Sequence, residues 1–121
     1  MTIYEEIGGK EAVDAAVGIF YQKVLADPLL IPFFEDVDMD NQSKMQARFF
    51  TTVFKGEASG AAEYMRKSHR HLVAEKGLND AHFDAVAGHL HATLQELKVP
   101  DHLTDQIMTA AGSLRDAVLD R

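Results

Sequence analysis

The amino-acid sequence predicts an all-α fold, and three observations support that prediction. Apolar residues recur at intervals of three and four along most of the chain, which is the spacing of one helix face. No stretch of Val, Ile and Thr alternates with polar residues as a half-buried strand would. Glycine and proline interrupt the pattern at helix-length intervals. Because 121 residues suffice for one domain with its own core, we expect a single domain over 1–121.

The first part of the chain is predicted to hold a short helix, a long helix and a tight turn. Thr2-x-x-Glu5 forms a capping box for the short helix, which the glycine pair at 8–9 ends. The long helix covers about 10–26. The segment 27–34, DPLLIPFF, contains two prolines and is predicted to be a turn or a short, tight helical piece. The apolar face of the long helix is formed by Val13, Val17, Phe20, Tyr21 and Val24.

A second long helix is predicted in the middle of the chain. It begins at Asp38 or Asp40, either of which can cap it, and ends near Gly56. The segment 57–62, EASGAA, is predicted to be a loop. A shorter helix follows and ends at Gly77.

Two further helices are predicted in the last third of the chain. One runs from Asn79 or Asp80 to Leu97, and the last begins at the pair Pro100-Asp101. The inward face of the first is formed by Phe83, Val86, Ala87, Leu90, Leu94 and Leu97. The inward face of the second is formed by Leu103, Ile107, Ala110, Ala111, Leu114 and Val118, so this helix is expected to continue to about residue 118.

Composition excludes several classes of function. The net charge of −7 argues against a nucleic acid or an anionic membrane as the main partner, because both select a basic patch. Cysteine is absent, which removes disulfides, thiolate metal sites and cysteine nucleophiles. The N-terminal residues lack the apolar segment of a signal peptide, and no stretch approaches about 20 apolar residues. We therefore expect a cytoplasmic protein.

Three polar residues fall on helix faces that are otherwise apolar. Stepping back by three or four from Phe49, Phe50 and Val53 reaches Gln46 and Gln42, and Tyr21 lies in the apolar stripe of the first long helix. A buried amide without a partner costs about 1–3 kcal/mol, so a polar group is expected opposite. The alternative is that Tyr21 lies at the edge of the core and both glutamines are exposed. Three such residues together favour an internal polar pocket.

The stretch EYMRKSHRHLVAEKGL contains two histidines, and helical spacing separates them. A helix turns by about 100° per residue. His69 shares a stripe with Met65, Leu72 and Val73, whereas His71 shares the charged face with Lys67 and Glu75. An inward histidine is more often a hydrogen-bonded core residue than a metal ligand. A site that needs only one protein ligand stays possible, and haem iron is such a site, since the porphyrin supplies four ligands.

Other candidate motifs are weak. His82, His89 and His91 lie on or near the long helix but mostly outside its buried face, and none pairs with another at a spacing of four. A zinc or di-iron site built from several side chains is therefore disfavoured. The two glycine-rich points are isolated stops and form no phosphate loop, and no Gly-x-Ser-x-Gly motif occurs. The carboxylates are expected to lie on solvated helix faces.

The sequence as a whole resembles the group I truncated haemoglobins. The matching segments, in order, are YEEIGG, FYQKVLAD, FFEDVDM, QARFF, YMRKSH, GLNDAHFDAVAGHL and VP, and together they cover nearly the whole chain. The resemblance implies a shortened globin in which two helix pairs stack as a two-over-two α-sandwich around one haem b.

The resemblance also implies roles for individual residues. His69 matches the proximal ligand of the haem iron. Tyr21, Gln42 and Gln46 match the distal positions that hydrogen-bond a ligand on the iron, a role that suits a tyrosine hydroxyl and two amides. The resemblance implies that further residues contact the haem or line its pocket and the route of gases to it. They are Phe34, with Phe33 beside it, Phe50, Met65, Leu72, Phe83 and Val86. Arg66 is implied to approach a haem propionate.

Two departures from the family pattern bear on the chemistry. Some members carry a histidine or lysine that reaches the iron from the distal side, and here that position is Met45. A thioether can ligate haem iron, although we favour a packing role for Met45 or a place at the mouth of the pocket. Some members attach haem covalently through a histidine near the C-terminus. The segment GSLRDAVLDR has none, so a non-covalent haem is expected.

The resemblance implies a haem protein that binds dioxygen, nitric oxide and carbon monoxide. It implies an enzyme activity, nitric oxide dioxygenation to nitrate, which would depend on an external reductase. The first alternative is a six-coordinate haem protein for electron transfer or redox sensing. The second is a helical interaction module without haem.

Overall fold

The computed structural model describes residues 2–121, apart from the side chain at position 59, and all of its regular structure is helical. The helices in chain order are α1 (Ile3–Glu6), α2 (Gly9–Leu25), the 3₁₀ turn η1 (Ile31–Phe33), α3 (Met39–Phe54), the 3₁₀ turn η2 (Ala58–Ala61), α4 (Ala62–Lys76), α5 (Asp80–Glu96), α6 (Asp101–Gly112) and α7 (Arg115–Val118). None of the described helices is both long and apolar enough to cross a lipid bilayer.

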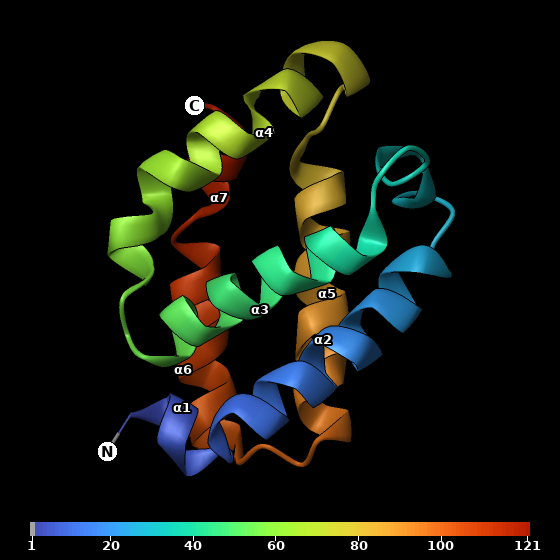
Figure 1. Ribbon diagram of the computed structural model, residues 1–121. Helices are drawn as coiled ribbons and strands as arrows, with labels where there is room; N and C mark the ends of the chain where they lie inside the picture. The colour runs from blue at the N-terminus through green and yellow to red at the C-terminus, as the bar shows by residue number, and fades with distance from the viewer. Residues whose placement is uncertain (1) are drawn as a thin grey trace.

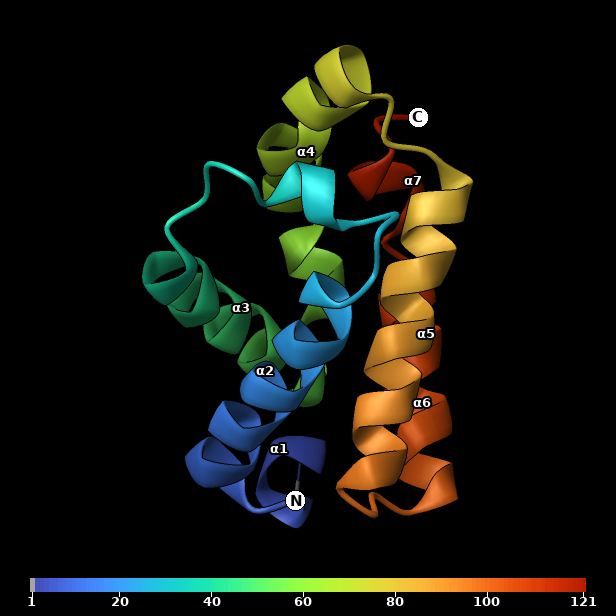
Figure 2. The same ribbon diagram turned by 90° about the vertical axis from the view of Figure 1, so that its right-hand side faces the viewer.

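Four of these helices form two stacked layers. Helix α2 packs against α3 in one layer, and α5 packs against α6 in the other. The layers meet where α2 contacts α5 and where α3 contacts α6 (Figures 1 and 2). The predicted two-over-two sandwich is therefore confirmed.

The space between the layers is filled by the predicted apolar faces. All five residues predicted for α2 are buried, and so are Phe83, Leu90 and Leu94 of α5. From α3, the buried residues are Phe50, Val53 and Phe54, while Phe49 is only half-buried. Three phenylalanines continue the packing across the layer, since Phe50 lies edge-on to Phe20 and stacks on Phe54.

Helix α4 lies outside this sandwich. Its main neighbours are α7 and η2, as Figure 1 shows for α7. All residues of α4 are described, and none of them is buried. The helix ends at Gly77, whose φ of +68° is left-handed, the conformation that glycine adopts without a steric penalty.

The structure refines two of the predicted boundaries. Asp38, rather than Asp40, caps α3, because its side chain accepts hydrogen bonds from the backbone N–H groups of Asp40 and Asn41. The segment 57–62 is not wholly irregular, since η2 forms within it and α4 begins at its end.

The prediction of one continuous last helix is wrong. Helix α6 ends at Gly112, and α7 begins at Arg115. The Ser113 hydroxyl donates to the carbonyl of Ala110 at the break. Four residues in and after the break have buried side chains: Leu114, Ala117, Val118 and Leu119.

Candidate functional site

A hydrogen-bonded chain of three side chains joins α2 to α3. The Gln42 amide N–H donates to the Tyr21 hydroxyl at 3.2 Å, and that hydroxyl donates to Gln46 Oε1 at 3.2 Å. Tyr21 is buried, with 6% of its surface exposed, and both glutamines are half-buried. The spacing of four between the glutamines places them on the same side of α3, so each can reach the hydroxyl. The polar partners expected for these three side chains are therefore one another.

Burial sets the protonation state of this cluster. Loss of solvent raises the pKa of Tyr21 above its ordinary value of 10.0, although the hydrogen bond from Gln42 works in the opposite direction. The hydroxyl therefore keeps its proton at neutral pH. Because that proton is directed at Gln46 Oε1, the amide N–H groups of Gln46 remain available to another acceptor.

Aromatic rings surround the hydroxyl chain. Phe34, which follows η1, lies edge-on to the Tyr21 ring with centroids 5.9 Å apart, and Phe20 lies edge-on at 5.2 Å. Both arrangements are among the preferred geometries of aromatic pairs. They hold the Tyr21 ring between Phe20 of its own helix and the segment that follows η1.

The two histidines of α4 take the orientations that spacing predicts. His69 is half-buried and His71 is exposed. His69 Nδ1 lies 2.8 Å from the carbonyl oxygen of Met65, one turn earlier. A carbonyl can only accept a hydrogen bond, so the proton must be on Nδ1 and the lone pair on Nε2. No hydrogen bond to Nε2 is made by the described residues.

Burial also favours the neutral form of His69. Loss of solvent lowers its pKa from 6.5, the charge of His71 acts in the same direction, and the Met65 carbonyl acts against both. The neutral imidazole therefore predominates at pH 7, with a fixed tautomer. A backbone carbonyl that orients a ring in this way is the usual support of a metal-bound histidine.

Several large apolar side chains on or beside η1, α3, α4 and α5 are incompletely covered. In an ordinary core such residues would be sealed from water. A planar apolar group against them would remove further apolar surface from water, at about 25 cal/mol per Å². The half-buried residues of this kind are Phe33, Phe34, Phe49, Met65, Leu72, Val73, Leu78 and Val86. Together with an uncommitted imidazole nitrogen, they fit a haem.

The remaining predicted site residues lie in different surroundings. Phe50 is part of the core, and Phe83 is buried with the Arg115 guanidinium 4.6 Å from its ring centre. Met45 is half-buried, and its sulfur accepts a hydrogen bond from the Asn41 amide at 3.6 Å. Arg66 is engaged by protein groups, since its Nη1 lies 3.5 Å from Asp120 Oδ1 and 3.4 Å from the carbonyl oxygen of Arg121.

Two sets of polar contacts were not predicted from the sequence. His89 Nε2 lies 2.8 Å from Asp27 Oδ2, both side chains are largely covered, and the contact lowers the pKa of Asp27. The expectation that this carboxylate is solvated is therefore wrong. The other set joins Arg66 and Arg70 to Asp120. No local pattern reveals either set, because the partners are 50 or more residues apart.

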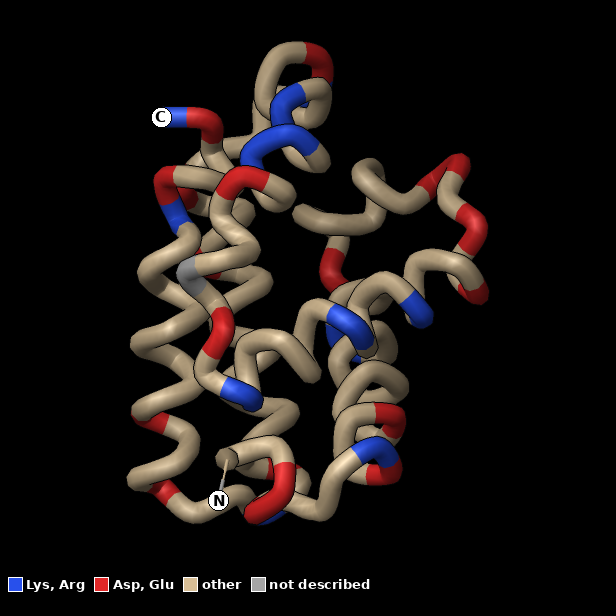
Figure 3. Tube along the Cα trace, turned by 60° about the vertical axis from the view of Figure 1, so that its left-hand side comes forward, with Lys and Arg blue, Asp and Glu red and all other residues tan. Residues whose placement is uncertain are grey.

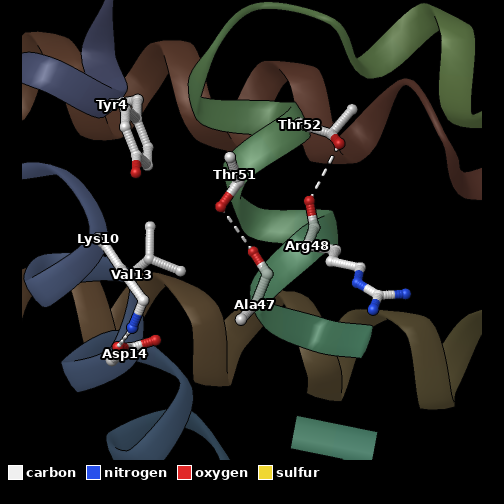
Figure 4. A pocket seen from close by; sticks show the side chains of 8 residues that line it. All are labelled: Tyr4, Lys10, Val13, Asp14, Ala47, Arg48, Thr51 and Thr52. Carbon is white, nitrogen blue, oxygen red and sulfur yellow. Dashed lines mark hydrogen bonds and ion pairs between the residues drawn. The ribbon is translucent and has the colours of Figure 1, made fainter. Parts of the chain in front are cut away.

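A shallow depression between α1, α2 and α3 offers no comparable chemistry (Figure 4). Several of its polar side chains are paired locally. Thr51 and Thr52 donate to carbonyl groups of their own helix, and Lys10 forms an ion pair with Asp14 at 2.6 Å.

Comparison with known proteins agrees with this geometry. The family model described as bacterial-like globin matches residues 2–120. A group 1 truncated hemoglobin from Synechocystis sp. is 46% identical over 93% of this chain and 90% of its own. One from Tetrahymena pyriformis is 41% identical over 87% of this chain and 84% of its own.

Solved structures agree in the fold. The 2/2 hemoglobin from Synechococcus sp. PCC 7002, described as a cyanomet state with covalently attached heme, has a TM-score of 0.90 and 42% identity, with both chains fully covered. The truncated hemoglobin of T. pyriformis has a TM-score of 0.82 and 37% identity over 98% of each chain. Further structures of that protein carry substitutions at one tyrosine and two glutamines. The chain belongs to the bacterial-like globin family, and its relatives within that family are group 1 truncated haemoglobins.

Proposed function

We propose that the protein binds one haem b without a covalent bond, with His69 as the axial ligand, and that it binds dioxygen, nitric oxide and carbon monoxide there. One observation carries the proposal. The Met65 carbonyl fixes the His69 tautomer and leaves the Nε2 lone pair free on a half-buried apolar face. When bound, the haem supplies an iron centre that exchanges small ligands and electrons.

The polar chain between α2 and α3 supports the distal half of the proposal. A diatomic ligand that gains negative charge is stabilised by N–H and O–H donors held in place beforehand. Tyr21 holds Gln46 by its oxygen, so the Gln46 amide presents its N–H groups outward, and Gln42 has one N–H left over. Tyr21 then acts partly through Gln46 rather than only as a direct donor.

The substituted positions in the T. pyriformis protein add support. Its tyrosine and two glutamines have the same separations along the chain as Tyr21, Gln42 and Gln46, which are 21 and 25 positions from the tyrosine. This shared spacing supports the proposal that the three positions act together in this chain.

We propose nitric oxide dioxygenation as the reaction. Dioxygen, nitric oxide and one electron give nitrate, O₂ + NO + e⁻ → NO₃⁻, and an external reductase supplies the electron. Each net hydrogen bond contributes about 0.5–1.5 kcal/mol, so two or three donors slow dioxygen release by one to three orders of magnitude. Slow release favours reaction with nitric oxide over delivery of dioxygen.

Spectroscopy and rapid mixing test the proposal together. The ferrous protein is expected to show a five-coordinate spectrum, to form a stable complex with dioxygen, and to give one nitrate per nitric oxide when mixed. A six-coordinate ferrous spectrum before any ligand is added would favour the redox alternative, with Met45 as the first candidate ligand. The hydrogen bond from Asn41 to the Met45 sulfur supports the five-coordinate arrangement.

The form of haem attachment has its own test. The Synechococcus structure is described with covalently attached heme, whereas residues 112–121 of this chain contain no histidine. Acidified organic solvent is expected to extract all of the haem and to leave a protein of unmodified mass. Haem that stays with the chain would contradict the non-covalent form.

A further inference from the structure

Helix α4 carries the proposed iron ligand, yet its apolar side chains, Met65 among them, pack against the core only partly buried. None of its residues is buried, and its principal helical neighbour is α7. Elsewhere in the molecule, helix positions are set by buried side chains of α2, α3, α5 and α6. The contacts between α4 and the C-terminal segment therefore have a large influence on where His69 lies.

The C-terminal segment itself is well anchored. Ala117, Val118 and Leu119 are at most 8% exposed. Arg121 forms two parallel contacts of 2.8 Å with the carboxylate of Asp80, at the start of α5, and Arg115 reaches the same carboxylate at 3.0 Å. Bidentate arginine–carboxylate pairs are the most directional ion pairs in proteins. Apolar and charged contacts thus anchor the segment after α7 to the sandwich.

The side chain of Asp120 reaches from this anchored segment to α4. Its Oδ1 lies 3.5 Å from Arg66 Nη1, and its Oδ2 lies 3.4 Å from Arg70 Nε. Arg66 and Arg70 are four residues apart, so they share one helix face, and His69 lies between them in the sequence. Figure 3 shows both signs of charge gathered at the end of the molecule where the chain terminates.

The backbone of Asp120 supports a specific role for its side chain. Its φ is +54°, in the left-handed region that residues other than glycine seldom adopt. Its amide donates to the carbonyl of Ala117, three residues earlier. The chain thus turns back on itself at Asp120, and in that turned conformation the carboxylate contacts both arginines.

We propose that Asp120 is a positioning residue for His69, acting through Arg66 and Arg70 to hold α4 at a defined distance and tilt relative to the sandwich. The proposal rests on the proposed function, in which His69 is the haem ligand. It assigns to Arg66 a second attachment, to the C-terminal segment, in addition to any contact with a propionate.

The variant Asp120→Asn tests the role without altering side-chain shape. Asparagine tolerates the left-handed conformation but removes the charge that both arginines contact. The matched control is Asp116→Asn, which removes a carboxylate 3.0 Å from Arg121 in the same segment and leaves both α4 arginines paired. Thermal unfolding of the haem-loaded proteins measures any general loss of stability in the two variants.

Two readouts report on α4 itself. The first is the iron–histidine stretching band of the ferrous protein in resonance Raman spectra. It is expected to shift in Asp120→Asn and to stay unchanged in Asp116→Asn. The second is amide hydrogen exchange over residues 62–76, which is expected to become about threefold to tenfold faster in Asp120→Asn, with α6 unchanged.

Varying the ionic strength tests the same charged contacts independently of any substitution. Raising the ionic strength from about 0.01 M to 1 M shortens the Debye length from about 30 Å to about 3 Å and weakens half-exposed pairs. The wild-type band is expected to move toward that of Asp120→Asn, and the band of the variant is expected not to move. An unshifted band and unchanged α4 exchange in Asp120→Asn, with or without a loss of stability, would overturn the proposal.

If His69 is not the haem ligand, these experiments give a different result from the one expected if Asp120 has no positioning role. In that case the wild-type protein would show no iron–histidine band that His69→Ala removes. Exchange over residues 62–76 would then still decide whether Asp120 holds α4. Faster exchange in Asp120→Asn alone would support its effect on the helix, and equal exchange in both variants would refute it.

Discussion

The helical sandwich and helix α4 are stabilised in different ways. Helices α2, α3, α5 and α6 meet through buried apolar side chains, several of them with 0–2% of their surface exposed. Helix α4 has no buried residue and is joined to the C-terminal segment by half-exposed charged groups. Because buried packing restrains side chains and helices, we expect the side of the site that holds Tyr21, Gln42 and Gln46 to be the more rigid one. On the side that holds His69, α4 is held by partly buried apolar side chains such as Met65, by polar contacts and, in our proposal, by the haem.

The largest expected effect distinguishes the two regions by stability. Val24 in α2 is fully buried, whereas Val73 in α4 is half-buried. Val24→Ala is expected to lower the free energy of unfolding by about 2–3 kcal/mol, and Val73→Ala by less than about 1 kcal/mol, because only the first leaves a sealed cavity. The helix preference for alanine over valine affects both equally. Urea unfolding monitored by circular dichroism measures both, and equal losses would contradict the comparison.

A second prediction concerns the rigid side of the site. Tyr21→Phe removes the hydroxyl that accepts from Gln42 and donates to Gln46. Dioxygen release is expected to become about tenfold faster, which corresponds to one hydrogen bond of about 1.4 kcal/mol. Stopped-flow displacement of dioxygen by carbon monoxide gives the rate. Tyr64→Phe, at a position with 57% exposure, is the control, and an unchanged rate in Tyr21→Phe would argue against the distal cluster.

The smallest expected effect concerns the pair that joins the end of α2 to α5. The hydrogen bond from His89 lowers the pKa of Asp27 below 3.8, so the folded state favours the ionised carboxylate. This stabilisation is fully present above pH 3.8 and is lost as the pH falls through the lowered pKa.

The variant His89→Gln tests this pair. Its deficit in unfolding free energy is expected to shrink as the pH falls below the ordinary pKa of an aspartate, about 3.9. Unfolding in urea at each pH measures the deficit. A deficit that persists unchanged in acid would mean that the pair does not contribute in this way.

The sequence allowed the helix registers to be predicted, for a local reason. Each helix alternates between core and solvent within a few residues, so the spacing of Val13, Val17 and Val24 already shows which side faces inward. The same logic separated His69 from His71. The position of Tyr21 beside two glutamines could also be inferred, because three polar residues on apolar faces require partners.

Contacts between distant segments could not be predicted in the same way. The break after Gly112 is marked locally only by the pair Gly112-Ser113, and the apolar spacing continues through it to Leu114 and Val118. The direction of the hydrogen bonds from Gln42 through Tyr21 to Gln46 depends on how α2 packs on α3. The partners Asp120 and Arg66 are 54 residues apart, and only the folded chain brings them together.

The central claim is that His69, and not its neighbour, ligates the haem iron. The most direct measurement compares the ferrous absorption and resonance Raman spectra of His69→Ala and His71→Ala. We expect His71→Ala to keep the wild-type spectra, because that side chain is exposed on the charged face of α4. We expect His69→Ala to lose the iron–histidine band and to regain a histidine-like spectrum when imidazole is added. Wild-type spectra in His69→Ala, or loss of the band in His71→Ala, would contradict the account.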